Sequence, residues 1–600
     1  MLRFRRDSRR VHVTLLDASS SSSPPATHQA KVATSGSSGV DLTGLLGLGG
    51  APAGSDDASA ADDGSVSVVS SSEADDASSS SSRSGVSSVK TGAGIGGVGE
   101  SSVTRGGVTV QVTSKYVRRE LRKLTKEDRE KFFESLHTIY HIGQQVGANL
   151  YGSKFRSIEV LVAEHLRGAA SKECDHWHDD AGILTHHMGF TLELEQSLQS
   201  VDPSVAMPYW DYTADAHFLG DKWPESQIFK EEWFGAASPA RADHVVDKGR
   251  WAFTPIKRVA DGELPNAHEI RNAYGLLRSP WNANPVPYLS RHRYTLGVED
   301  AGFSLPSCSQ FKRAFKYEWL GQILSELNGL LHGPVHVMTG GHWFWDEKQN
   351  NVSELVAAAH LESASGFFLL SSKFLWRQGF LRCPEYCSTD TPARECTCSC
   401  PDKLFAHNGT LMQSTELLAV SGLEYLNNGW LRDGFELEAN MTSGSVWDVL
   451  CHVGHAGEMF TSAAPYDPLF WPLHGLAERF LTIKRLASIA GTTTLNNSWG
   501  YEHVGTLASD TNVVCDWSEV EGLHLPMCKS GTCPGHKSDD ILPMGGFVNG
   551  TETYTNLEFY EFTAPHNTEL PYVYDSFTKW EGCDAQNISF WRGVDDDDDL

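Results

Sequence analysis

Long apolar runs are missing from this 600-residue chain, and so is an excess of basic residues. No stretch reaches the ~18 consecutive apolar residues of a membrane-spanning helix, so we expect no membrane span. The 49 lysines and arginines are outnumbered by 76 aspartates and glutamates, which gives a net charge of −27 at pH 7. Because so acidic a chain favours solubility over binding to phosphate backbones, we expect no nucleic-acid partner.

Aromatic residues are almost absent from the first hundred positions, which consist mostly of Ser, Gly, Ala and Asp. Such a composition buries too little apolar surface to offset the conformational entropy lost on folding. We therefore predict that residues 1–107 are disordered and that residues 108–505 form the main domain. Residues 506–600 are expected to form a cysteine-containing C-terminal extension.

The twelve cysteines are unevenly distributed, and five of them lie in CPEYCSTDTPARECTCSC, between Cys383 and Cys400. This segment lacks the second ligand pair and the histidines of a zinc site, so we favour a disulfide-stapled loop. Six Asn-X-Ser/Thr sequons fit the same oxidising compartment and favour a secreted or organelle-lumen protein. The N-terminal MLRFRRDSRR does not support this localisation, because the apolar stretch of a secretory signal does not follow it.

Helical patterns dominate the rest of the chain. The segment LTKEDREKFFESLHTIYHIG begins with a cap at Thr125 and places apolar residues at helical spacing. Similar patterns cover SIEVLVAEHLRG, HHMGFTLELEQSLQS, FKYEWLGQILSELNGLLHGPVH and DPLFWPLHGLAERFLTIKRLASIAG. No alternating strand pattern matches them in strength. We predict a mainly α fold, a central antiparallel helix bundle with long loops and a disulfide-stapled insertion.

Several histidines occupy these helical segments. His332 and His336 are four residues apart, so on a continuous helix both imidazoles project from one face. His178 and His187 are nine residues apart, and His474 lies in DPLFWPLHGLAER. Imidazole binds copper, zinc, iron and nickel, and a site built only from neutral histidines favours redox copper over a carboxylate-rich iron site.

Three of these segments together resemble one known family. The segment HDDAGILTHHMGFTLELEQSLQSVDPSVAMPYWDYTAD, which begins at His178, resembles the first copper-binding region of tyrosinases, catechol oxidases and molluscan hemocyanins. LLHGPVHVMTGGH and DPLFWPLHGLAER resemble the two parts of the second region. The three occur in the family's order, which is more specific than any one motif.

The resemblance implies two copper ions as cofactors, held by six histidines in a central helix bundle. Carried over position by position, the ligands are His165, His178 and His187 for the first copper and His332, His336 and His474 for the second.

Two of these assignments have competitors. The first ligand of the first copper usually ends a pattern similar to Phe-Val-X-X-His, and LVAEH matches that pattern at His165. His137 and His141, on an earlier helix, remain alternatives for this ligand. His186 competes with its neighbour His187, although the spacing of nine residues supports His187.

The resemblance also implies O2 and a small phenolic molecule as substrates, with o-diphenols oxidised to o-quinones and monophenols hydroxylated in some members. Members that hydroxylate often have Asn directly after the first ligand of the second copper, where it helps to hold a water that takes the phenol proton. Here this residue is Gly333, so we expect catechol oxidation to exceed hydroxylation, with Glu326 as the candidate for the water-holding role.

Two further expectations come from the family. An oxygen-carrying, hemocyanin-like protein is the alternative function, which repeated copies of the unit would favour; we find one copy. The C-terminal extension is expected to pack over the site, as extensions do in relatives. The sequence does not indicate an oligomeric state.

Overall fold

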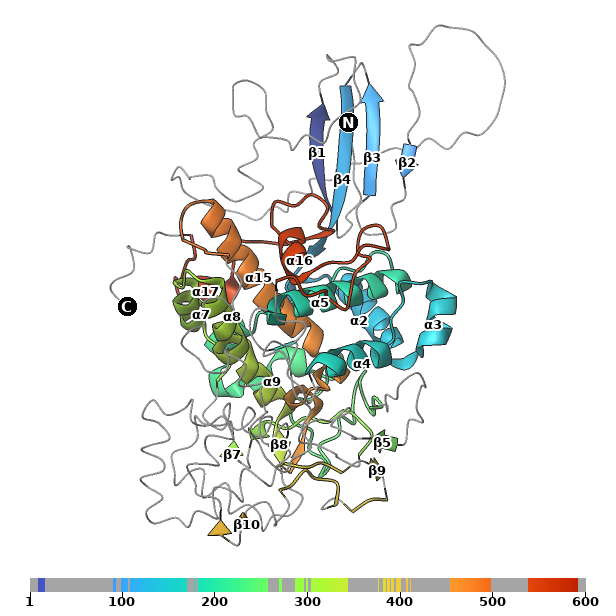
Figure 1. Ribbon diagram of the computed structural model, residues 1–600, viewed down its shortest axis with the longest axis vertical. Helices are drawn as coiled ribbons and strands as arrows, with labels where there is room; N and C mark the ends of the chain where they lie inside the picture. Colours follow the sequence, from blue (N-terminus) through green and yellow to red (C-terminus); the bar gives the residue numbers. More distant parts are fainter. Residues whose placement is uncertain are drawn as a thin grey trace.

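The computed structural model of the chain describes most of five segments, residues 108–169, 182–256, 304–343, 454–497 and 538–591. Helices form the body of the molecule, and long strands project from one end of it (Figure 1). The shorter described segments are 9–16, 90–92, 99–105, 177–178, 269–271, 286–295, 298–299, 376, 381–384, 386–388, 390–392, 395–400, 406–407 and 410–411.

The prediction of a mainly α fold is confirmed. The principal helices are α2 (Lys126–His141), α3 (Gln144–Tyr151), α4 (Ile158–Ala169), α5 (Gly182–Val201), α6 (Tyr212–Phe218), α7 (Cys308–Phe315), α8 (Leu320–Glu326), α9 (Gly333–Gly340), α15 (Phe470–Ile489), α16 (Asn556–Phe562) and α17 (Glu581–Asp584). A π-helical segment, η6, covers Leu327–His332, and short 3-10 turns include η13 (Glu458–Phe460) and η14 (Ala464–Tyr466).

The predicted helices at α2 and α5 form for the reasons that the sequence indicates. The Thr125 side chain accepts a hydrogen bond from the Asp128 N–H at 3.1 Å and so caps the start of α2. Helix α2 then buries Phe132, Phe133 and other apolar residues on one face. Helix α5 is buried along most of its length, because α2, α15 and α16 all pack against it.

The helix predicted across FKYEWLGQILSELNGLLHGPVH is broken into several pieces. Helix α8 ends at Glu326, the π-helical η6 follows, and α9 begins at Gly333. A Cβ atom at Gly333 would lie 2.7 Å from the Asn328 carbonyl oxygen, so the backbone approaches too closely there for a side chain. The wider π-helical turn brings this carbonyl against Gly333.

A sheet that the sequence analysis missed lies at one end of the helices (Figure 1). Its central strand β4 (Val108–Arg118) pairs antiparallel with β1 (Arg9–Leu16) and β3 (Gly99–Arg105), and β3 pairs with β2 (Lys90–Gly92). Strands β1 to β3 lie within residues 1–107, where composition predicts disorder. The C-terminal strand β13 (Tyr572–Tyr574) pairs parallel to the end of β4.

Arg118, at the end of β4, connects four elements through a buried network. Its guanidinium donates to Glu195 of α5 at 2.7 Å and to Glu478 of α15 at 2.8 Å. Tyr572 of β13 also donates to Glu478, and its ring stacks against the guanidinium at 3.4 Å. All three charged side chains are at most 4% exposed, so these contacts operate without solvent screening.

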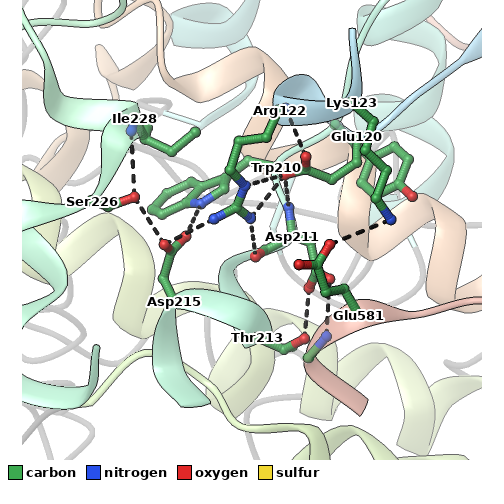
Figure 2. A network of polar contacts seen from close by, with 12 residues as sticks. Glu120, Arg122, Lys123, Trp210, Asp211, Thr213, Asp215, Ser226, Ile228 and Glu581 are labelled. Carbon is green, nitrogen blue, oxygen red and sulfur yellow. Dashed lines mark hydrogen bonds and ion pairs between the residues drawn. The ribbon is translucent and has the colours of Figure 1, made fainter. Parts of the chain in front are cut away.

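A second buried network links the segment after β4, at Glu120 and Arg122, to α6. Figure 2 shows Arg122 between Glu120 and Asp215, with the Arg122–Asp215 contact at 2.9 Å. The Trp580 indole, at the N-cap of α17, donates to Asp211 at 3.0 Å. Residues far apart in the sequence are thereby fixed around the start of α6.

Residues 538–591 are part of the core rather than an appendage. A disulfide joins Cys308 at the start of α7 to Cys583 in α17, across 275 residues. The predicted stapling of the cysteine-rich loop is confirmed by the disulfide between Cys383 and Cys398. Within the described ranges, no helix is long and apolar enough to cross a membrane.

We expect Arg118→Met to lower the free energy of unfolding by about 3–5 kcal/mol, because it leaves two buried carboxylates without their cation. Arg241→Met is the matched control: its partner Asp243 lies at the surface, and such pairs contribute about 0–1 kcal/mol. Adding Glu195→Gln and Glu478→Gln to Arg118→Met is expected to restore part of the loss. Equal urea midpoints for the Arg118 and Arg241 variants would contradict this account.

Candidate metal centre

Six histidines lie in two groups whose ring nitrogens converge, and they are the six that the sequence analysis selected. Within each group, one nitrogen from every ring lies within 4.8 Å of the other two. The first group is His165, His178 and His187, and the second is His332, His336 and His474.

The first group comes from α4, the turn at residues 177–178, and α5. The Nδ1 atom of His165 lies 2.8 Å from the Ser462 carbonyl oxygen, and that of His187 lies 2.7 Å from the Ile183 carbonyl oxygen. A carbonyl can only accept, so Nδ1 has the proton in each ring. The Nε2 atoms are then unprotonated and able to bind a metal.

The second group comes from the end of η6, from α9 and from α15. The Nε2 atoms of His332 and His336 are 2.8 Å apart, and each lies 3.3 Å from Nε2 of His474. The centre of this triangle is about 1.8 Å from each nitrogen, slightly less than the ~2.0–2.1 Å of metal–imidazole bonds. The spacing of these three nitrogens would therefore suit one metal ion held by His332, His336 and His474.

Helix geometry and one backbone contact position these rings. His336 lies four residues after His332, and its Nδ1 atom is 3.0 Å from the Met459 carbonyl oxygen in η13. The ring of Phe470, one helical turn before His474, lies 4.1 Å from the His474 ring and 5.6 Å from that of His165. One aromatic side chain thus contacts a histidine of each group.

The two groups are adjacent. The rings of His187 and His474 are parallel to within 2°, with centroids 4.5 Å apart, and the His187 and His332 centroids are 6.3 Å apart. Because each group has its own set of three nitrogens, the arrangement fits two neighbouring metal ions rather than one shared ion.

Burial keeps these rings neutral. Desolvation, followed by the mutual repulsion of the imidazoles, lowers the pKa of His187, His332 and His474 well below the usual 6.5. Burial also lowers the pKa of His336, to about 4. These four rings therefore remain neutral at neutral pH, as metal binding requires.

The donor set fits copper. Neither group includes a carboxylate or a thiolate from the residues that the structure describes. Uncharged imidazole nitrogens suit copper among the first-row metals, whereas oxygen-rich sets suit magnesium, calcium and manganese.

The alternative histidines lie elsewhere. His137 and His141 stack on each other in α2 with centroids 3.8 Å apart, and neither belongs to a group. His186 is adjacent to His187 in α5, but its Nδ1 atom contacts the Gly182 carbonyl oxygen at 2.8 Å and its ring lies near Trp177.

Glu326, the candidate for holding water, accepts a hydrogen bond from the Tyr317 hydroxyl at 3.2 Å. A small cavity borders the histidines between α5, η6 and α15, and Glu326 is not part of its wall. The Glu326 carboxylate instead contacts Tyr317, three residues before the start of α8.

The described part of the C-terminal segment, residues 538–591, packs on a side of α5 that faces away from this cavity. Asn556 of α16 contacts Thr185 at 2.5 Å, and Met544 lies so near Gly189 that a Cβ atom there would be 2.9 Å from it. These two α5 residues lie about 200° around the helix from His187. Among its described residues, none lines the cavity.

The groups that orient the histidines leave no recognisable pattern in the sequence. Ser462 and Met459 contribute backbone carbonyls, which any residue type supplies, so no side-chain pattern could identify them. Phe470 was visible in DPLFWPLHGLAER, but its contact with His165, 305 residues earlier, depends on the fold.

Comparisons with known proteins find similarity to tyrosinases. Residues 133–359 match the family model described as the common central domain of tyrosinase. Tyrosinase from Streptomyces galbus is 50% identical over 165 residues, which cover 26% of this chain and 51% of the relative. Tyrosinase from Streptomyces antibioticus is 26% identical over 192 residues, or 28% of this chain and 62% of the relative.

The structure of tyrosinase from Burkholderia thailandensis at low pH aligns with 76% of this chain and 74% of its own, at 15% identity and a TM-score of 0.31. The two Streptomyces relatives are matched over 62% and 51% of their own length, so this chain spans less than two thirds of each. The similarity to tyrosinases depends on the sequence matches.

We expect His187→Gln to remove one metal ion per chain and His186→Gln to remove none. Both substitutions change a buried histidine in the same turn of α5, but only His187 belongs to a group of three. Metal content after copper loading and gel filtration, measured by mass spectrometry, tests the assignment. If only the His186 variant lost copper, His186 rather than His187 would be the metal ligand.

The stacked His137 gives the protein a defined response to acid. Burial, with His141 and Arg250 nearby, lowers its pKa from 6.5 to about 4. Between these values the unfolded chain binds the proton and the folded chain does not, so stability falls as the pH falls from 6.5 towards 4. Between pH 7 and pH 5, the free energy of unfolding should therefore fall less for the His137→Gln variant than for the wild type. Urea titrations at each pH measure this difference. Parallel losses would show that His137 contributes nothing to this response.

Proposed function

We propose that the chain is a copper-dependent oxidase of phenols of the tyrosinase family, because its residues 133–359 match the model of that family's central domain. The observation that supports the proposal most directly is the pair of adjacent histidine groups, each with three converging ring nitrogens. Such a pair can hold two copper ions, three histidines to each.

Two bound copper ions would supply the electron transfer from the phenol to O2. An o-diphenol loses two electrons and two protons to become an o-quinone, so one O2 that accepts four electrons from two diphenols leaves as two water molecules. The protein's own part is to fix the ligands and to keep water away from them. Carbonyl acceptors at Ser462, Ile183 and Met459 fix three of the rings.

We propose that catechols are the better substrates and that monophenol hydroxylation is weak or absent. Gly333 has no side chain to hold a proton-accepting water, and the carboxylate of Glu326 is engaged by Tyr317. The crowding at Gly333 also means that a longer side chain cannot be accommodated there without moving the backbone at Asn328.

We propose in addition that the protein works in a secretory or organelle lumen. The disulfides Cys308–Cys583 and Cys383–Cys398 support this, because disulfides persist in oxidising compartments and are rare in the cytosol.

The full chain loaded with copper is expected to bind two ions and to oxidise catechol with uptake of one O2 for every two quinones. Tyrosine turnover should be much slower. His474→Ala should lose copper from the second group and abolish quinone formation, because it removes one of only three nitrogens. Two bound coppers that take up O2 reversibly without forming quinone would instead indicate an oxygen carrier.

A further inference from the structure

His178 differs from the other five histidines of the two groups in its local backbone. It lies in the turn at residues 177–178, whereas the others lie on α4, α5, η6, α9 and α15. A helix fixes the direction of a side chain through its own backbone hydrogen bonds, but a turn depends more on contacts with other segments. The position of His178 is therefore set by the residues that hold this turn.

Trp177 and Asn328 both hold the turn. Trp177 is buried, and its ring lies edge-on to the rings of His165 and His187, with centroids 4.9 Å and 5.6 Å away. The side-chain amide of Asn328, in η6, donates a hydrogen bond to the His178 carbonyl oxygen at 2.7 Å. Trp177 thus anchors the turn to its own histidine group, and Asn328 links it to the segment that contributes to the second group.

The backbone of Asn328 acts on the second group. Burial lowers the pKa of His332, and the Asn328 carbonyl partly offsets this effect. The interaction is weaker than a full hydrogen bond, because within the described residues the buried His332 Nδ1 atom has no partner of standard geometry. The π-helical turn produces the arrangement, since its i→i+5 bonding brings the Asn328 carbonyl opposite Gly333. Such turns are frequent at functional sites.

His178 also lies near both groups. Its ring centroid is 5.2 Å from that of His165 and 4.9 Å from that of His187. In the second group, burial lowers the pKa of His332 and His336, and repulsion by His178 adds to the effect. A shift of this one turn would therefore change the geometry of the first group and its distance from the second.

We propose that Asn328 is a positioning residue for the first metal position, because its side chain fixes His178 while its backbone stays next to His332. The inference rests on the proposed function, since it requires that both groups hold copper. It also predicts an asymmetry. A substitution at Asn328 removes the side-chain contact with His178 but leaves the backbone carbonyl in place, so the first group should be affected and the second should not.

Asn328→Leu tests this role, because leucine has nearly the shape of asparagine but no hydrogen-bond donor. One copper should bind about 10–100-fold more weakly than in the wild type, the usual effect of removing a partner that orients a metal ligand. The other copper should bind as tightly as before. Titration of the copper-loaded full chain with a copper chelator, with copper per chain measured by mass spectrometry, gives both affinities without any measurement of activity.

Two further variants identify the copper that is weakened. In a His474→Ala background, which disables the second group, adding Asn328→Leu should weaken the remaining copper by the same factor. In a His187→Gln background, which disables the first group, it should leave the affinity unchanged. Equal weakening in both backgrounds would overturn the proposal, because it would indicate a general loss of structure.

Asn567→Leu is the matched control. The Asn567 amide donates to the Phe562 carbonyl at the same distance of 2.7 Å, and both residues lie outside the histidine groups. This variant should bind both coppers as the wild type does. If Asn328→Leu does not fold, Asn328→Ala removes the same donor with less bulk and gives the same comparison.

The two hypotheses fail in different ways. A wild-type chain that binds no copper would refute the proposed function. Two coppers held equally tightly by the wild type and by the Asn328 variants would refute the positioning role of Asn328 and leave the proposed function intact.

Discussion

The positions of the metal ligands depend on one buried cation. Arg118 contacts Glu195 in α5 and Glu478 in α15, and these two helices also hold His187 and His474. Glu478 lies one helical turn after His474, and Glu195 lies two turns after His187. The ion pairs therefore fix the spacing of the helices near the point where the two histidine groups face each other. Strand β13 completes this arrangement by placing Tyr572 against both Arg118 and Glu478.

Neutral donors in an apolar environment give the centre its chemical character. Imidazoles compensate none of a metal's positive charge, and the buried carboxylates of Glu195 and Glu478 are already neutralised in part by Arg118. A site of this kind favours the lower charge state of a redox metal, which suits an ion that takes electrons from a substrate. The same burial that keeps His187, His332, His336 and His474 neutral also reduces their contact with bulk water.

The ligand set could be predicted from the sequence because each motif is local. His332 and His336 occur within five residues, and His474 lies in a segment with its own aromatic and proline pattern. The helices at α2 and α5 were predictable for the same reason, since capping and apolar spacing act over a few residues.

What could not be predicted depends on contacts between distant segments. Strand β13 is three residues long and forms only because β4, more than 450 residues earlier, offers an edge. The π-helical η6 preserves the apolar spacing of an ordinary helix, so the interruption before Gly333 leaves no clear sign in the pattern. The alternation of Val and Thr in Val108–Arg118 was visible, but the low-complexity residues around it obscured the strand.

The disulfide between Cys308 and Cys583 has a consequence for the integrity of the molecule. A protease cut anywhere between residues 498 and 537 would divide the chain into two polypeptides, yet this bond would keep them covalently joined. The smaller fragment would also retain its pairing with β4 and its contacts with α5. A molecule nicked in this way would migrate as one species without reductant and as two with it, while its histidine groups remained assembled.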